Sequence, residues 1–203
     1  MPAPESYADA MTLMREILGD SYTHLHVERV RVEETLDPQN TCVTCEVTDT
    51  ANNEKFDIVG HGTGVVDAFF HAMVERFAAE YPSLKTIHFS SFSLQALLDT
   101  KKNFAGTDAE TEVTLQISNS EGKLFPFSHS SRSMISSSII TSLLGLEYFI
   151  NSERAFVTIY YALKDAKARN RSDLVQRYSN SLAILVQNTS YSQVIEKLRK
   201  EMP

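Results

Sequence analysis

The same order of predicted elements occurs twice along the chain. Each half begins with three strand-like runs and closes with a helix-like run whose apolar residues recur at helical spacing. In the first half these runs lie at about 23–34, 41–49, 54–60 and 64–80. In the second half they lie at about 84–97, 110–119, 123–128 and 133–150. The chain is therefore predicted to contain an internal duplication of a β-β-β-α unit.

The apolar positions of the two halves also correspond. The matching sets are Val43, Cys45 and Val47 with Val113, Leu115 and Ile117; Phe56 and Ile58 with Phe125 and Phe127; and Val66, Phe70 and Phe77 with Ile135, Ile139 and Leu146. The first strand of each half changes face, between Val27 and Val30 and between Phe89 and Phe92, which requires a bulge or a strong twist. We predict an α+β fold with approximate two-fold symmetry, in which helices pack on one face of antiparallel sheet.

Further elements are expected on both sides of the duplicated region. Helical spacing predicts an opening helix at about 5–18, with Gly19 as its stop. Alternation from Ala155 to Tyr161 predicts another strand, and helices are expected from Ser172 and Ser190, which pack on the domain or on a second subunit. The predicted division is an N-terminal helix (1–22), a central domain (23–162, with repeats at about 23–82 and 83–151) and a helical extension (163–203).

A glycine-rich turn precedes the helix of the first half. The run Gly62-Thr63-Gly64 leads into this helix, and Asp67 lies in its first turn. Such a turn brings bare N–H groups to the positive end of a helix, which favours a carboxylate or phosphate ligand. A turn that needs glycine only for its backbone angles has the same pattern, so both interpretations stay open.

The corresponding helix start of the second half carries hydroxyl groups instead. Ser131, Ser133 and Ser136 stand where the first half has Gly62, Gly64 and Asp67. These hydroxyls can cap helix N–H groups or bind an anion with help from Arg132, but the acidic residue is missing. We therefore expect two related helix starts that are not identical sites.

Composition and charge narrow the function classes. The net charge is −7 and the lysines and arginines are scattered, which argues against nucleic-acid binding. No targeting segment is apparent and no apolar run approaches the ~20 residues needed to span a bilayer, so we expect a cytoplasmic protein that does not bind membranes.

Three possible chemical sites are considered and not favoured. Cys42 and Cys45 lie three apart on an alternating strand and so point to opposite faces, which favours a core role for Cys45 over metal or redox chemistry. His24 and His26 share one face of a strand, a geometry that can bind a metal, but no third ligand is evident. A hydrolase built on His61 or His129, the serine clusters and Asp67 or Asp108 lacks a G-x-S-x-G elbow. We expect no metal, no cofactor and no enzymatic activity.

Two motifs resemble those of a known family. The run Gly62-Thr63-Gly64-Val65-Val66-Asp67-Ala68 and the run Gly106-Thr107-Asp108-Ala109 resemble the C-terminal allosteric (dimerisation) domain of 2-isopropylmalate synthase and citramalate synthase. That family has a Gly-x-Gly-Pro-Val-Asp-Ala helix start and a Gly-Thr-Asp-Ala hairpin, and the similarity runs from about residue 23 to 150. Val65 departs from the pattern by replacing the proline, and the serine-rich second helix start departs from its glycine and acidic residues.

The resemblance implies a homodimer that binds leucine, isoleucine or a related carboxylate as a feedback effector near the helix starts. The implied ligand-binding residues are Gly62, Gly64, Asp67, Ala68, Gly106, Thr107, Asp108, Ala109, Ser131 and Ser133. A chain of 203 residues filled by this domain leaves no room for the ~250-residue catalytic barrel, so the acetyl-transfer chemistry is not carried over. The chain is then either a free-standing relative or a fragment of a longer chain.

A second hypothesis is a structural assembly module without a ligand, which dimerises or binds a separate catalytic synthase chain. A bulky side chain such as Arg132 or Phe70 between the two helix starts would favour this second hypothesis.

Overall fold

The computed structural model describes residues 5–97 and 109–187. Its helices are α1 (Glu5–Leu18), α2 (Val65–Phe77), α3 (Met134–Ala168) and α4 (Ser172–Val186), with short 3-10 helices η1 (Gly19–Ser21) and η2 (Pro82–Thr86). Its strands are β1 (Leu25–Leu36), β2 (Gln39–Asp49), β3 (Glu54–Gly62), β4 (His88–Leu97), β5 (Glu110–Ser118) and β6 (Leu124–Ser131). This order confirms the predicted α+β class and the duplicated β-β-β-α unit.

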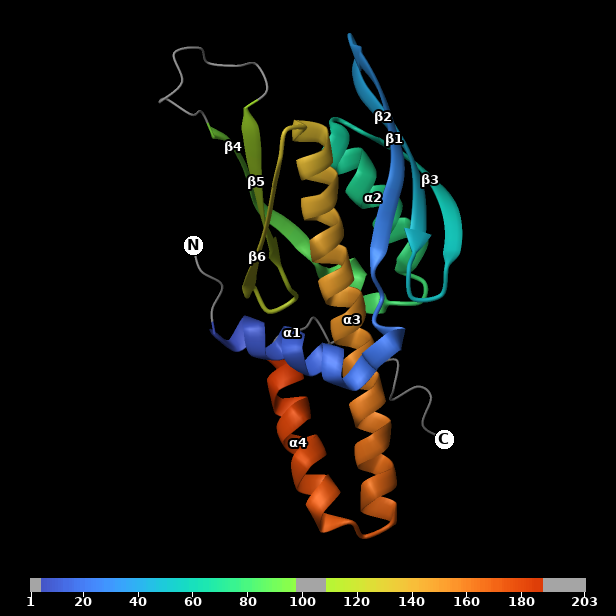
Figure 1. Ribbon diagram of the computed structural model, residues 1–203, viewed down its shortest axis with the longest axis vertical. Helices are drawn as coiled ribbons and strands as arrows, with labels where there is room; N and C mark the ends of the chain where they lie inside the picture. The colour runs from blue at the N-terminus through green and yellow to red at the C-terminus, as the bar shows by residue number, and fades with distance from the viewer. Residues whose placement is uncertain (1–4, 98–108, 188–203) are drawn as a thin grey trace.

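The two units form two separate antiparallel sheets with the helices between them. The sheet orders are β1-β2-β3 and β4-β5-β6. Helix α2 packs on β2 and β3, α3 packs on β5 and β6, and the two helices contact each other. Figure 1 shows the two sheets on either side of the helix pair. The starts of α2 and α3 are therefore held close together by the core.

Both predicted changes of face are β-bulges at equivalent positions. The register shifts between Val27 and Arg29 against β2, and between Phe89 and Ser91 against β5. One extra residue, Glu28 or Ser90, interrupts each ladder, and the side chains beyond it return to the inner face.

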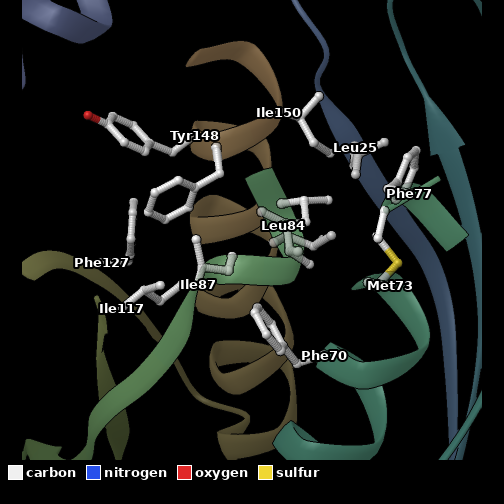
Figure 2. Packing of buried hydrophobic residues seen from close by; sticks show 14 of the residues in the cluster. Leu25, Phe70, Met73, Phe77, Leu84, Ile87, Ile117, Phe127, Tyr148 and Ile150 are labelled. Carbon is white, nitrogen blue, oxygen red and sulfur yellow. The ribbon is translucent and has the colours of Figure 1, made fainter. Parts of the chain in front are cut away.

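A continuous apolar core joins the two units. Phe70, Met73 and Phe77 of α2 lie near Leu84 and Ile87, which connect the two units (Figure 2). Aromatic residues of the second unit extend this core: the rings of Phe125 and Phe149 lie 5.3 Å apart and nearly perpendicular. Because α2 and α3 contact each other within this core, each unit covers part of the apolar helix surface of the other.

The predicted strand from Ala155 to Tyr161 is wrong, because these residues lie inside α3. Ala155 and Ile159 are four residues apart and both buried, which is a helical repeat that also satisfies an alternating pattern. Alternation therefore did not distinguish a helix that is covered on two sides by α1 and α4 from a strand.

The other flanking predictions agree with the structure where it describes the chain. Helix α1 ends before Gly19, whose φ of +50° is the left-handed conformation that favours glycine. Helix α4 begins at Ser172, although its cap residue is Arg171 and no side chain caps it. It packs against α3 and α1, and the α3–α4 hairpin projects beyond α1 (Figure 1). The helix predicted from Ser190 lies outside the described residues.

Candidate functional site

A groove lies where the starts of α2 and α3 meet the edge strand β4. Its volume is about 450 Å³. It is lined by Thr63, Gly64, Val65, Val66 and Asp67 from the first helix start, by Phe89, Phe92 and Leu94 from β4, and by Met134, Ile135 and Ser138 from α3. The groove thus combines backbone and the Asp67 carboxylate at the start of α2 with mainly apolar side chains from β4 and α3.

The apolar wall of this groove is unusually exposed. Phe92 and Leu94 lie on the helix-facing side of their sheet, yet 47% and 43% of their surfaces are accessible. Met134 is 53% exposed. Large apolar side chains that gather in one exposed hollow mark a binding surface more often than scattered ones do.

The start of α2 is open toward this groove. Its cap residue is Gly64, no side chain caps the helix, and the first intrahelical bond is from the Ala68 N–H to the Gly64 carbonyl at 2.9 Å. The N–H groups of Val65, Val66 and Asp67 precede that bond, so they form the positive end of the helix. Nothing lies within 4 Å of the point where a Gly64 Cβ would stand, so a ligand has room to approach the backbone.

The other glycines of this turn serve packing. A Cβ on Gly60 would lie 2.1 Å from the Ala68 carbonyl oxygen, and one on Gly62 would lie 2.6 Å from the Ala68 nitrogen. These contacts hold the end of β3 against the start of α2. None of Gly60, Gly62 and Gly64 has a positive φ, so their backbone angles do not require glycine. Gly60 and Gly62 instead permit close packing, and Gly64 leaves space.

Asp67 stabilises the same turn. Its carboxylate accepts the Thr63 N–H at 3.0 Å and lies 3.1 Å from Nδ1 of His71, one helical turn further on. It also lines the groove, with 40% of its side chain exposed. Its neighbour Ala68 is fully buried and does not line the groove.

The start of α3 is closed by its own serines. The Ser133 hydroxyl accepts the Ser136 N–H at 3.2 Å, so it caps the helix. The Ser131 hydroxyl bonds to the Ser133 carbonyl at 2.9 Å and to the Ser137 hydroxyl at 2.8 Å. Neither Ser131 nor Ser133 lines the groove, where α3 contributes Ser138 and apolar side chains instead. The two helix starts thus differ, as the sequence predicted.

The space between the helix starts is not filled by the side chains considered earlier. Neither Arg132 nor Phe70 lines the groove. Phe70 is buried beneath it, with its ring centroid 4.1 Å from that of Phe89. The second motif falls mostly outside the described residues, which exclude Gly106, Thr107 and Asp108; Ala109 is half-buried just before β5.

Sequence reasoning missed the β4 contribution to the groove. The alternation of Phe89, Phe92 and Leu94 about the bulge predicted a strand, but a strand pattern does not reveal that α2 and α3 leave this edge uncovered. An excess of large apolar residues on an edge strand is the one signal that could have indicated it.

The cysteines and His24, which the sequence analysis weighed as metal or redox residues, lie in the following surroundings. Cys45 is fully buried, and burial raises the pKa of its thiol to about 12, whereas Cys42 is half-buried on the other face of β2. His24 Nδ1 lies 3.2 Å from the Glu147 carboxylate. In residues 5–97 and 109–187 no three His, Cys, Asp or Glu side chains form a group that could hold a metal ion.

The helices of residues 5–97 and 109–187 lack the combination of length and hydropathy of a membrane span, and none of them could cross a bilayer.

Comparison with protein families identifies the domain. The family model of the LeuA allosteric (dimerisation) domain matches residues 6–150. The chain belongs to this family. The match runs from α1 into α3 and contains every residue that lines the groove. A search of curated proteins found no significant match.

The family match confirms the resemblance inferred from the two motifs. The LeuA-type domain has a regulatory, dimerising role and is distinct from the catalytic part of the synthase. The last part of α3 and all of α4 lie beyond the matched segment. The α3–α4 hairpin thus extends beyond the segment that the family model matches.

Proposed function

We propose that this LeuA-type domain is a non-catalytic regulatory dimer that senses leucine, isoleucine or a related small carboxylate in the groove beside α2. The observation that carries the proposal is the pairing of an uncapped helix start with an open apolar wall. An amino acid with a branched apolar side chain has the matching polar and apolar ends.

The ligand carboxylate is assigned to the N–H groups at the start of α2. These groups carry the positive end of the helix, and Gly64 leaves them accessible. The start of α3 is a poorer anion site because Ser133 already occupies part of it. The ligand ammonium lies toward Asp67, the carboxylate that lines the groove.

The apolar side chain of the ligand is assigned to the β4 wall. Phe92, Leu94 and Met134 offer exposed apolar surface there. Burial of apolar surface contributes roughly 25 cal/mol per Å², so covering this wall favours a branched aliphatic ligand over a small polar one.

The first experiment is thermal unfolding against a panel of amino acids and 2-oxo acids at millimolar concentration. A ligand present at about 100 times its dissociation constant adds about 2.7 kcal/mol to the free energy of unfolding. A selective rise with leucine, isoleucine or valine is expected. No rise with any compound would contradict ligand sensing and favour the assembly module, for which the exposed β4 wall would be a protein contact surface.

One single variant and one matched pair of variants locate the ligand. Gly64→Ala adds a methyl group in the space left for the ligand and should abolish the rise without unfolding the domain, because its φ of −164° suits alanine. Leu94→Ala should weaken the response, whereas Leu124→Ala, a similarly exposed leucine on the other face of the same sheet, should not. Equal effects of the two leucine variants would contradict the assignment to the groove.

A further inference from the structure

A second cleft lies further along α3, on the side that faces α1. It has a volume of about 320 Å³ and is bounded by α1, the segment before β1, β6 and α3. None of its lining residues lines the groove beside α2. The proposed effector groove therefore does not account for it.

A buried carboxylate lines this cleft. Glu147 is only 6% exposed, and it accepts the Leu25 N–H at 2.6 Å. The His24 ring packs against it, with Nδ1 3.2 Å from the carboxylate and 63% of its side chain exposed. Burial raises the pKa of Glu147, while the Leu25 N–H and His24 oppose that rise. A cation inside the cleft would interact with this carboxylate with little competition from solvent.

A cation and apolar walls complete the cleft. Arg15 lines it from α1, with its guanidinium carbon 5.6 Å from the centre of the Tyr22 ring. Phe127 of β6 and Tyr148 of α3 face α1 across the cleft, with their ring centres 5.7 Å apart, and Figure 2 shows the two rings near each other. Met11 and Leu144 add aliphatic surface. The cleft thus combines one buried carboxyl group, one exposed guanidinium group and an apolar surface.

We propose that this cleft binds a small zwitterion of the α-amino acid type, with its ammonium group at Glu147, its carboxylate at Arg15 and an apolar side chain against Met11 and Leu144. A simple anion would place its charge near Glu147, and a simple amine would place its charge near Arg15. Only a ligand with both charges pairs both groups, so the cleft discriminates against each half-ligand. This site is independent of the effector groove, because the two share no residue.

The methionines of the chain provide separate reporters for the two sites. Met11 lines the cleft, Met134 lines the groove, and Met14 and Met73 are fully buried. In protein labelled with ¹³C at the methionine methyl groups, titration with L-leucine and L-phenylalanine should shift the Met11 signal saturably. The matched half-ligands 3-phenylpropanoate and phenethylamine should bind at least about tenfold more weakly than L-phenylalanine.

Two variants test the assigned contacts. Arg15→Gln should remove the advantage of L-phenylalanine over phenethylamine, and Glu147→Gln should remove its advantage over 3-phenylpropanoate. Arg15 is exposed on α1, so its variant decides the question even if Glu147→Gln fails to fold. Gly64→Ala should leave the Met11 response intact, whatever happens at Met134.

Each outcome supports or overturns the proposal. A Met11 signal that does not move with either amino acid would overturn it. Half-ligands that bind as tightly as L-phenylalanine, or a Met11 response unchanged in both variants, would do so as well. A Met134 response without a Met11 response would support the effector groove alone, and the reverse would support the cleft alone.

Discussion

Asn151 and Thr23 form a reciprocal pair of buried hydrogen bonds between α3 and the segment that leads into β1. The Thr23 N–H donates to Asn151 Oδ1 at 2.8 Å, and Asn151 Nδ2 donates to the Thr23 carbonyl at 2.8 Å. Four residues earlier on the same helix, Glu147 accepts the Leu25 N–H. Helix α3 thus fixes the start of the first sheet through side chains that satisfy backbone groups of Thr23 and Leu25.

Replacement of Asn151 by alanine should therefore be strongly destabilising. It leaves a buried N–H and a buried carbonyl of Thr23 without partners, at about 1–3 kcal/mol for each group. Urea unfolding should show a loss of about 2–5 kcal/mol, with Asn180→Ala on the exposed face of α4 as a near-neutral control. A loss below about 1 kcal/mol would mean that water replaces the amide at this position.

Alanine at Gly60 should affect folding and not ligand binding. Its Cβ would lie 2.1 Å from the Ala68 carbonyl oxygen and 2.9 Å from the Ala72 Cβ, so the start of α2 must move away from β3. We expect a loss of about 3 kcal/mol by denaturant unfolding, compared with about 0.5–1 kcal/mol for Gly64→Ala at the cap of α2. Similar stabilities for the two variants would contradict the different roles assigned to these glycines.

Glu147 should make the folded protein less stable as pH rises, which is the opposite of the effect of a carboxyl group with a lowered pKa. Its pKa in the folded protein is raised above the ordinary value of 4.5, chiefly by burial, so the folded state binds more protons than the unfolded state as pH rises through that value. The free energy of unfolding then falls with rising pH, by at most about 1.4 kcal/mol per pH unit, until the folded-state pKa is passed. The contribution is fully present at acidic pH and lost above the raised pKa.

Glu147→Gln removes this titration and should flatten the stability profile above about pH 4.5. The check is the difference in free energy of unfolding between wild type and variant, measured by urea titration at several pH values. Glu121→Gln, on the exposed β5–β6 turn, is the matched control for the loss of one carboxyl group. A wild-type profile parallel to that of Glu147→Gln would contradict a raised pKa for this carboxyl.

The sequence predicted the duplicated unit because two periods, two residues for strands and about 3.6 for helices, are local properties of the chain. It also predicted a change of face in the first strand of each half, which the structure shows to be a bulge, at Glu28 in β1 and at Ser90 in β4. The same logic failed from Ala155 to Tyr161, where a helix covered on two sides shows no single polar face. Local periodicity therefore describes elements better when one of their faces meets solvent.

The groove was only partly predictable for a related reason. Gly64 and Asp67 lie in a glycine-rich turn that is followed by a helix, a pattern that can be recognised from neighbouring residues alone. The exposure of Phe92 and Met134 depends on where α2 and α3 begin relative to β4, which is a tertiary property. The hydrogen bond from the Leu25 N–H to Glu147 joins residues more than a hundred positions apart, so no local sequence pattern indicates it.

Exchange of the two helix caps would test which helix start binds the effector. Ser133 caps α3 by accepting the Ser136 N–H, and a serine at Gly64 would stand in the equivalent position relative to the Asp67 N–H. Gly64→Ser should stabilise the domain by a few tenths of a kcal/mol and abolish the leucine response, because the hydroxyl competes for the N–H groups assigned to the ligand carboxylate. Ser133→Ala should cost about 1 kcal/mol and leave the response unchanged. If leucine still raised the unfolding temperature of Gly64→Ser as in wild type while Ser133→Ala lost the response, the carboxylate would bind at α3 and the proposed asymmetry between the two units would be reversed.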